Sequence, residues 1–164
     1  MLTRPAWLPE ILSVDGDWKD LLERLYAVFE HDFKHGRPRL NEFEVWWDRK
    51  KRDETGYEEG FYHLIEREEK VTMRRLFDPR RAERLSWAAP TINNSNDTEV
   101  KVWDYREADG KTNTYVWLHQ WDYVIILRKK AMRVGPVVFL VTAFHVDGDR
   151  KRRHLRRKCE KKAL

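Results

Sequence analysis

Hydrophobic and polar residues follow two different periods along this chain. In the first part, apolar side chains recur at helical spacing, which predicts three helices, over residues 15–31, 57–69 and 78–90. Asp78 is suited to cap the third of these helices, and Pro79 fits its first turn. Alternation of apolar with other residues predicts a short strand over residues 43–47.

Beyond a polar loop at residues 93–97, the period changes from helical spacing to two. Four apolar segments then predict strands, over residues 100–105, 114–118, 123–127 and 137–146. Turn signals at hairpin spacing join them into a four-strand antiparallel meander, and a helix is expected to follow over about residues 148–162. We therefore expect an α+β fold, with N-terminal helices packed on the meander sheet and a basic C-terminal helix.

The length of 164 residues suits one domain with a hydrophobic core, and a hydrophobic content of 41% argues against disorder. We expect a single domain over 1–164, consisting of an N-terminal helical and strand extension (1–56), a core (57–148) and a basic C-terminal helix or tail (149–164). No apolar run is long enough for a transmembrane helix, and the N-terminus lacks the apolar stretch of a signal peptide. With one cysteine, the chain is expected to be cytoplasmic and to have no membrane partner.

The formal net charge of +5 is concentrated at the C-terminal end of the chain. Residues 149–164 contain nine Lys or Arg and two Asp or Glu, whereas residues 1–148 are slightly acidic. Such a segment attracts phosphate backbones, although a solvated basic tail has the same composition. The predicted RNA-binding residues of this segment are Arg150, Arg152, Arg153, Arg156 and Arg157.

Several classes of site lack their sequence signature. The seven glycines form neither a dinucleotide-binding nor a P-loop motif, and neither Ser86 nor Ser95 lies in a G-x-S-x-G motif. The six histidines and Cys159 do not show metal-ligand spacing, so we expect neither a metal site nor a cofactor.

Polar clusters remain as candidates for chemistry. On the predicted helix 57–69, His63, Arg67 and two further charged residues share one face, which is also what a solvated helix face looks like. Arginines can bind phosphate in a bidentate manner, and tryptophan offers a surface on which bases stack. The candidate RNA-binding residues of the body are accordingly Arg80, Arg81, Trp87, Arg128 and Lys129. Thr142 is the only hydroxyl residue in the apolar segment 137–144, and it can equally be an ordinary strand residue.

Four segments resemble a phage- and toxin-associated group of the barnase–EndoU–colicin–RelE (BECR) ribonuclease superfamily. They are, in chain order, GFYHLI (60–65), DPRRAERLSW (78–87), WDYVIIL (121–127) and LVTAF (140–144). The resemblance covers about residues 57–160. It implies helices followed by a four-strand antiparallel sheet, and RNA cleavage without a metal ion.

The resemblance also implies which residues are catalytic. His63 matches the helix-borne histidine, Arg67 the basic residue one turn later, and Arg84 the arginine that precedes the motif tryptophan. Thr142 matches the threonine or serine of the last core strand. Phe144 departs from the group, which often has tyrosine there, so any contribution from that hydroxyl is missing.

Together with these residues, the resemblance implies a toxin-like endoribonuclease in which the 2′-hydroxyl of the RNA attacks the adjacent phosphate. Histidine suits proton transfer near neutral pH, and arginine suits charge stabilisation because it stays protonated. The expected partners are RNA of unknown class and an antitoxin or immunity protein. Two alternatives stay open: a non-catalytic module that binds RNA or the ribosome, and an interaction protein bound by an acidic partner.

Overall fold

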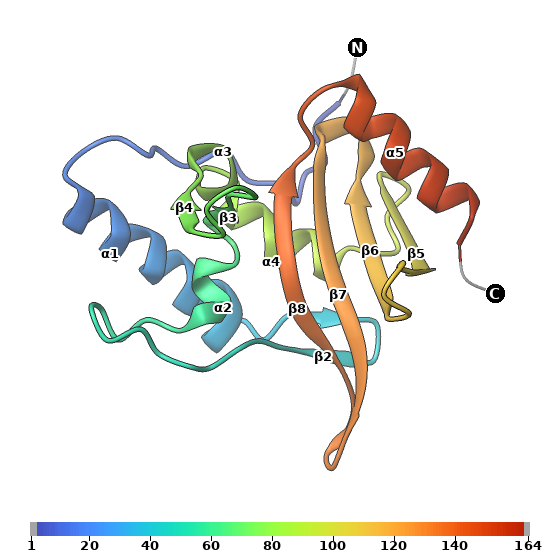
Figure 1. Ribbon diagram of the computed structural model, residues 1–164, viewed down its shortest axis with the longest axis horizontal. Coiled ribbons are helices and arrows are strands. Elements are labelled where there is room, and N and C mark those ends of the chain that lie inside the picture. The colour runs from blue at the N-terminus through green and yellow to red at the C-terminus, as the bar shows by residue number, and fades with distance from the viewer. Residues whose placement is uncertain (1–2, 163–164) are drawn as a thin grey trace.

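A six-stranded mixed sheet, flanked by helices, forms the centre of this protein (Figure 1). The computed structural model describes residues 3–162. In chain order its elements are α1 (Trp18–Phe29), η1 (Glu30–His35), β1 (Arg39–Leu40), β2 (Phe43–Trp46), α2 (Glu59–Tyr62), β3 (Glu66–Glu68), β4 (Arg75–Phe77), α3 (Pro79–Ala82), α4 (Leu85–Asn93), β5 (Val100–Arg106), β6 (Thr112–Leu118), η2 (His119–Trp121), β7 (Tyr123–Met132), β8 (Gly135–His145) and α5 (Asp149–Glu160).

The expected four-strand antiparallel meander is wrong as a description of this sheet. Strands β5 to β8 do pair antiparallel in chain order, but the sheet has the order β1-β2-β8-β7-β6-β5. Strand β2 joins β8 in parallel, with Glu44 opposite Val137 and Trp46 opposite Phe139. A parallel pair needs a long crossover between its strands, so the local alternation that reveals hairpins does not reveal this pairing. The class α+β and the basic C-terminal helix are retained.

The predicted helix 57–69 is also wrong, because the chain leaves the helix after one turn. Helix α2 ends at Tyr62, and β3 then pairs antiparallel with β4 as a separate hairpin. Glu66, expected on a solvated helix face, is 8% exposed and accepts hydrogen bonds from Arg52 and Arg75. A buried carboxylate needs hydrogen-bond partners, and Glu66 finds them in arginines outside the helix. The helix can therefore end here, although the spacing of apolar residues alone predicts that it continues.

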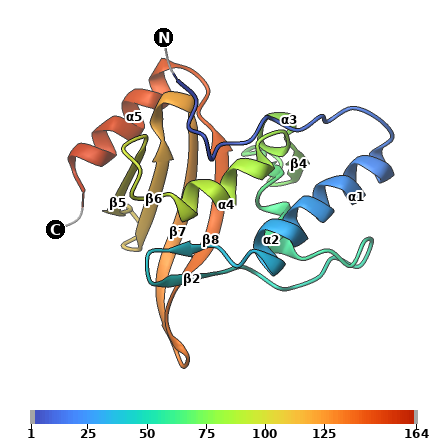
Figure 2. The same cartoon turned by 180° about the vertical axis from the view of Figure 1, so that it is seen from behind.

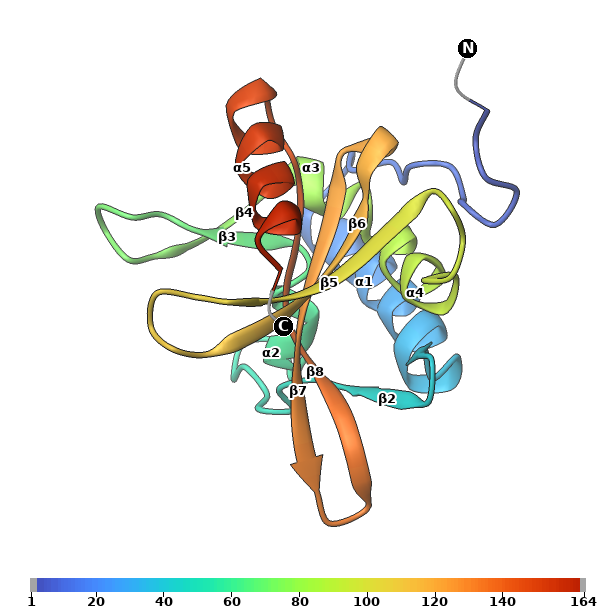
Figure 3. The same cartoon turned by 90° about the vertical axis from the view of Figure 1, so that its right-hand side faces the viewer.

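The two faces of the sheet have separate cores. On one face, α4 lies over the sheet, and α1 packs against α4 (Figure 2). The core on this face includes Val116 and Ile125. Helix α5 lies over the opposite face (Figure 3). There, Leu155 of α5 packs into a cluster that includes Trp103 and Trp117. The basic C-terminal segment is therefore an amphipathic helix with one buried residue. No helix within residues 3–162 combines the length and the apolar character that crossing a membrane requires.

The C-terminal half of β8 positions the candidate site. Strand β2 pairs only with residues 137–139 of β8, so the edge of β8 beyond Phe139 has no strand partner on that side. The short helix α3 lies against this edge, and Arg81 of α3 donates a hydrogen bond to Thr142 of β8. Helix α5 begins four residues after the strand ends. Residues of β3, α3, β8 and α5 therefore meet where β8 ends.

Candidate phosphate-binding site at the end of β8

Two hollows adjoin at the end of β8 and share one residue, His145. The first, of about 310 Å³, is called here the cationic hollow, and its basic lining residues are Arg67, Arg80, Arg81 and Lys151. Phe144 also lines it, together with the carboxylates of Asp78 and Asp147. The second, of about 410 Å³, is called the aromatic hollow, and its lining includes Arg84, Trp87, Gln120 and Trp121.

Local capping orients the arginines of α3. Asp78 is the N-cap of this helix, and its Oδ1 accepts hydrogen bonds from the backbone N–H groups of Arg80 and Arg81 at 3.0 and 3.3 Å. Pro79 occupies the first helical position, where no backbone donor is needed. The segment 78–81 is therefore a capped helix start, and Arg80 and Arg81 on it line the hollow at the end of β8.

Arg81 links three elements and is largely buried. Its Nη1 donates to the carbonyl oxygen of Glu66 at 2.7 Å and to Oγ1 of Thr142 at 3.2 Å. Its guanidinium group lies 5.5 Å from the ring centre of Phe144. The side chain is 17% exposed, and this burial lowers the pKa of Arg81 from its ordinary value. Phe144 thus lies beside the guanidinium group of a largely buried arginine.

Arg84 occupies the turn between α3 and α4. Its Nη1 donates to the carbonyl oxygen of Arg80 at 3.0 Å and to a carboxylate oxygen of Glu83 at 2.5 Å. The guanidinium group lies 5.2 Å from the ring centre of Trp87. Trp87 is 4% exposed and donates its Nε1 hydrogen to the carbonyl oxygen of Pro9, so little of its ring is open to a base.

Buried polar atoms without partners concentrate at this end of the sheet. Within residues 3–162, eleven buried side-chain nitrogen or oxygen atoms have no hydrogen-bond partner. Five of them lie at the shared histidine or next to it: His145 Nδ1, Arg81 Nε, Arg84 Nε, Trp121 Nε1 and Tyr123 OH. Arg81 Nε has only an ion-pair contact with Asp78, at 3.5 Å. Each unpaired buried donor costs about 1–3 kcal/mol, so ordered water, an ion or a ligand is expected to supply partners here. Arginine N–H donors in this arrangement suit the oxygens of a phosphate group.

His145 is suited to accept a proton. It is the last residue of β8 and lies opposite Tyr123 of β7. Burial lowers the pKa of His145 from its ordinary value of 6.5, and the positive charges of Arg84 and Arg80 lower it further. The imidazole is therefore neutral at pH 7, as a general base requires.

The predicted catalytic residues do not all meet. Arg67 lines the cationic hollow, Thr142 binds Arg81 beside it, and Arg84 lines the adjoining hollow. His63 follows α2 and lines neither hollow. Burial lowers the pKa of His63, and the positive charge of Arg75 lowers it further, whereas the arginines that act on His145 are Arg84 and Arg80. The two histidines therefore have different charged neighbours. Sequence reasoning missed His145, although it directly follows the LVTAF segment that carried the resemblance.

The predicted RNA-binding arginines of α5 fall into two groups. Arg152 donates to both carboxylate oxygens of Asp122, at 2.6 and 2.8 Å, and so fastens the helix to the sheet. Four others are exposed and make no ion pair in the described part of the chain: Arg150, Arg153, Arg156 and Arg157. Lys151 connects this exposed surface to the cationic hollow, since it lies on the first turn of α5.

Two predicted RNA-binding residues of β7 already have protein partners. Arg128 donates two hydrogen bonds to Oδ1 of Asn113, at 3.0 and 2.8 Å. Lys129 pairs with Asp104 at 3.0 Å. Both lie on the part of β7 that pairs with the first half of β8, away from His145.

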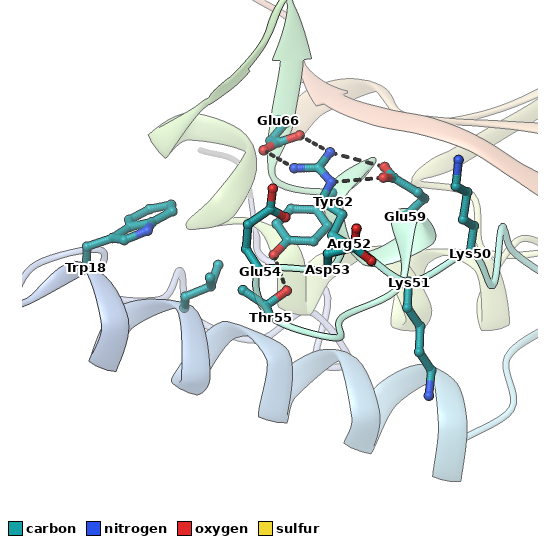
Figure 4. A pocket seen from close by; sticks show the side chains of 11 residues that line it. Trp18, Lys50, Lys51, Arg52, Asp53, Glu54, Thr55, Glu59, Tyr62 and Glu66 are labelled. Carbon is teal, nitrogen blue, oxygen red and sulfur yellow. Dashed lines mark hydrogen bonds and ion pairs between the residues drawn. The ribbon is translucent and has the colours of Figure 1, made fainter.

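A larger hollow, of about 570 Å³, lies between α1 and the segment that precedes α2 (Figure 4). Arg52 crosses it and donates hydrogen bonds to both Glu59 and Glu66, at 2.7–3.1 Å. The same guanidinium group stacks on Tyr62, 3.6 Å from the ring centre. Its donors are used within the protein, so this arginine anchors the fold around α2 and β3.

Comparison of the chain with protein-family models, with curated proteins and with solved structures gave no match. The BECR resemblance therefore stays a prediction from sequence. Within residues 3–162, no three or more His, Cys, Asp and Glu side chains are grouped so that they could hold a metal ion.

Proposed function

We propose that this protein is a metal-independent endoribonuclease that cleaves RNA by attack of the 2′-hydroxyl on the adjacent phosphate. The observation that carries the proposal is the cluster of arginines and unpaired buried donors around the neutral His145. The BECR resemblance leads to the same activity from independent observations, namely the motifs themselves. In this proposal the catalytic histidine is His145, and not His63 as the resemblance implied.

Each group around the hollows has one task in the reaction. His145 accepts the proton of the 2′-hydroxyl while the 2′-oxygen forms its bond to phosphorus. Arg80, Arg81 and Arg84 stabilise the extra negative charge on the five-coordinate phosphorus, since guanidinium groups stay protonated. Lys151, which lines the cationic hollow, gives a proton to the 5′-oxygen as the bond from phosphorus to that oxygen breaks. The products are a 2′,3′-cyclic phosphate and a 5′-hydroxyl, and no further reactant is consumed.

The charge of helix α5 is an argument that the substrate is a polymer and not a single nucleotide. Its exposed arginines continue from Lys151 at the rim of the cationic hollow. Contacts of this kind with neighbouring phosphates release counterions and make binding strongly dependent on salt. We therefore expect α5 to hold the RNA backbone on either side of the scissile phosphate.

The test compares two histidine variants of the full chain. Wild-type protein is incubated with an oligoribonucleotide in EDTA, and products are identified by mass spectrometry as 2′,3′-cyclic phosphates. His145→Gln should lower the cleavage rate by about 10²–10⁴-fold, the usual contribution of a general base. His63→Gln is the matched control, because it changes a second partly buried histidine outside the hollows.

The outcomes separate the proposal from its rivals. The wild-type rate should rise with pH and level off below pH 6.5, because the pKa of His145 is lowered from that ordinary value. An oligodeoxynucleotide should stay intact, because it lacks the 2′-hydroxyl. Binding of RNA without any cleavage overturns the enzyme and favours a binding module. Loss of cleavage in His63→Gln alone overturns the assignment of His145.

A further inference from the structure

The two adjoining hollows differ in chemistry, and this difference divides a nucleotide between them. The cationic hollow offers positive charge, as a phosphate requires. The aromatic hollow contains the ring of Trp121, the apolar side chain of Ile11 and the amide of Gln120. Its volume of about 410 Å³ lies within the range of small-molecule sites, roughly 300–1,000 Å³.

We infer that the aromatic hollow binds the nucleobase of the nucleotide whose 2′-hydroxyl attacks, so that it selects the base on the 5′ side of the cut. The inference rests on the proposed function, because it places the scissile phosphate in the cationic hollow. A ribose lies between its own base and its 3′-phosphate. His145, the residue common to both hollows, is then next to the 2′-hydroxyl.

Three side chains of the aromatic hollow suit a nucleobase: Trp121, Gln120 and Ile11. Trp121 is partly exposed, and aromatic rings of this kind stack on bases of any sequence. Its Nε1 donor is buried and has no partner within the described structure. Gln120 is exposed and provides both a donor and an acceptor for the edge of a base. Ile11 is 48% exposed and offers apolar contact area.

Both walls of the aromatic hollow are held in place before any ligand binds. Trp87 donates its indole hydrogen to the carbonyl oxygen of Pro9 at 2.8 Å, which fastens the N-terminal segment beside Ile11. On the other side, Asp122 follows η2 in the left-handed conformation, with φ of 54°. Arg152 of α5 binds both of its carboxylate oxygens. A strained residue that the surroundings hold firmly is typical of a preorganised binding site.

The experiment varies only the base on the 5′ side of the cut. Short oligoribonucleotides carry each of the four bases or an abasic ribose at that position, and kcat/KM is measured for the full-length protein. Removing the base should lower kcat/KM by about 10- to 100-fold, the effect of losing one stacked base. Trp121→Ala should cause a similar loss on the intact substrates and none on the abasic one. Gln120→Ala should change the order of preference among the four bases.

A matched control and a binding assay make each outcome decisive. Trp18→Ala removes a tryptophan of α1 that is 50% exposed and lines neither hollow. This substitution should leave kcat/KM unchanged for both the base-containing and the abasic substrate. Equal cleavage of base-containing and abasic substrates overturns the subsite even if RNA is cleaved. Binding of an uncleavable 2′-O-methyl oligonucleotide is measured in parallel by calorimetry. If the affinity for the 2′-O-methyl oligonucleotide depends on its base and on Trp121 while no RNA is cleaved, the base-binding subsite is supported and the proposed ribonuclease activity is refuted.

Discussion

Arg81 should stabilise the fold through a measurable coupling with Thr142. The substitutions Arg81→Ala and Thr142→Val, alone and together, form a double-mutant cycle across the free edge of β8. Arg81 donates to Thr142 at 3.2 Å and to the carbonyl oxygen of Glu66 at 2.7 Å, so its loss separates α3 from both β8 and β3.

The expected magnitude follows from two opposing effects. Hydrogen bonds from a charged donor contribute about 1.5–3 kcal/mol each, which gives up to about 6 kcal/mol for the two. Removing a buried charge also recovers part of its desolvation cost, and Arg81 is only 17% exposed. We therefore expect Arg81→Ala to lower the free energy of unfolding by about 2–3 kcal/mol. At about 2–4 °C per kcal/mol for a chain of this size, Tm falls by roughly 4–12 °C.

The coupling energy is measured by urea unfolding, followed by tryptophan fluorescence and circular dichroism. We expect about 1 kcal/mol between the two positions, because a contact of 3.2 Å is at the weak end of the range. Arg150→Ala serves as the control, since this arginine is exposed on α5, and should change stability by less than about 0.5 kcal/mol. A coupling below about 0.3 kcal/mol would refute the claim that Arg81 holds Thr142.

Three further predictions concern stability. Burial lowers the pKa of His145 and of two other histidines from 6.5, so the free energy of unfolding should decline as pH falls through 6.5, measured by urea unfolding at pH 8, 6 and 5. A Cβ at Gly60 would lie 2.6 Å from the side chain of Trp47, so Gly60→Ala should destabilise by about 1–3 kcal/mol in the same assay. Leu155→Ala should lower Tm through the loss of about 2–4 kcal/mol while leaving RNA affinity in a gel shift unchanged, because the cluster around Trp103 loses its cover but α5 keeps its charge.

Local patterns explain which elements could be predicted from the sequence. Strands β5 to β8 follow one another as antiparallel neighbours. Their pairing can therefore be predicted from the alternation of side chains and from the turns between the strands. The amphipathic spacing over residues 15–31 predicts α1 equally well, and Asp17 caps it in the structure. The parallel pairing of β2 with β8 was missed, because about ninety residues separate the two strands and no local pattern joins them.

The candidate site shows the same limit. The sequence identified Arg67, Arg80, Arg81, Arg84 and Thr142 as candidates, and the structure places all five around the end of β8. The sequence could not place His145 beside these residues, because that position depends on how the folded chain brings β8 and α3 together.

The sequence by itself determined helix α1, the antiparallel neighbours β5 to β8 and the basic C-terminal helix, since each depends on residues that are neighbours in the chain. The tertiary structure decided the mixed order of the sheet and the end of α2 at Tyr62. It also brought α3, β3, β8 and α5 together around His145. Those features depend on contacts between distant residues, and the free energy of such contacts is set only when the chain has folded.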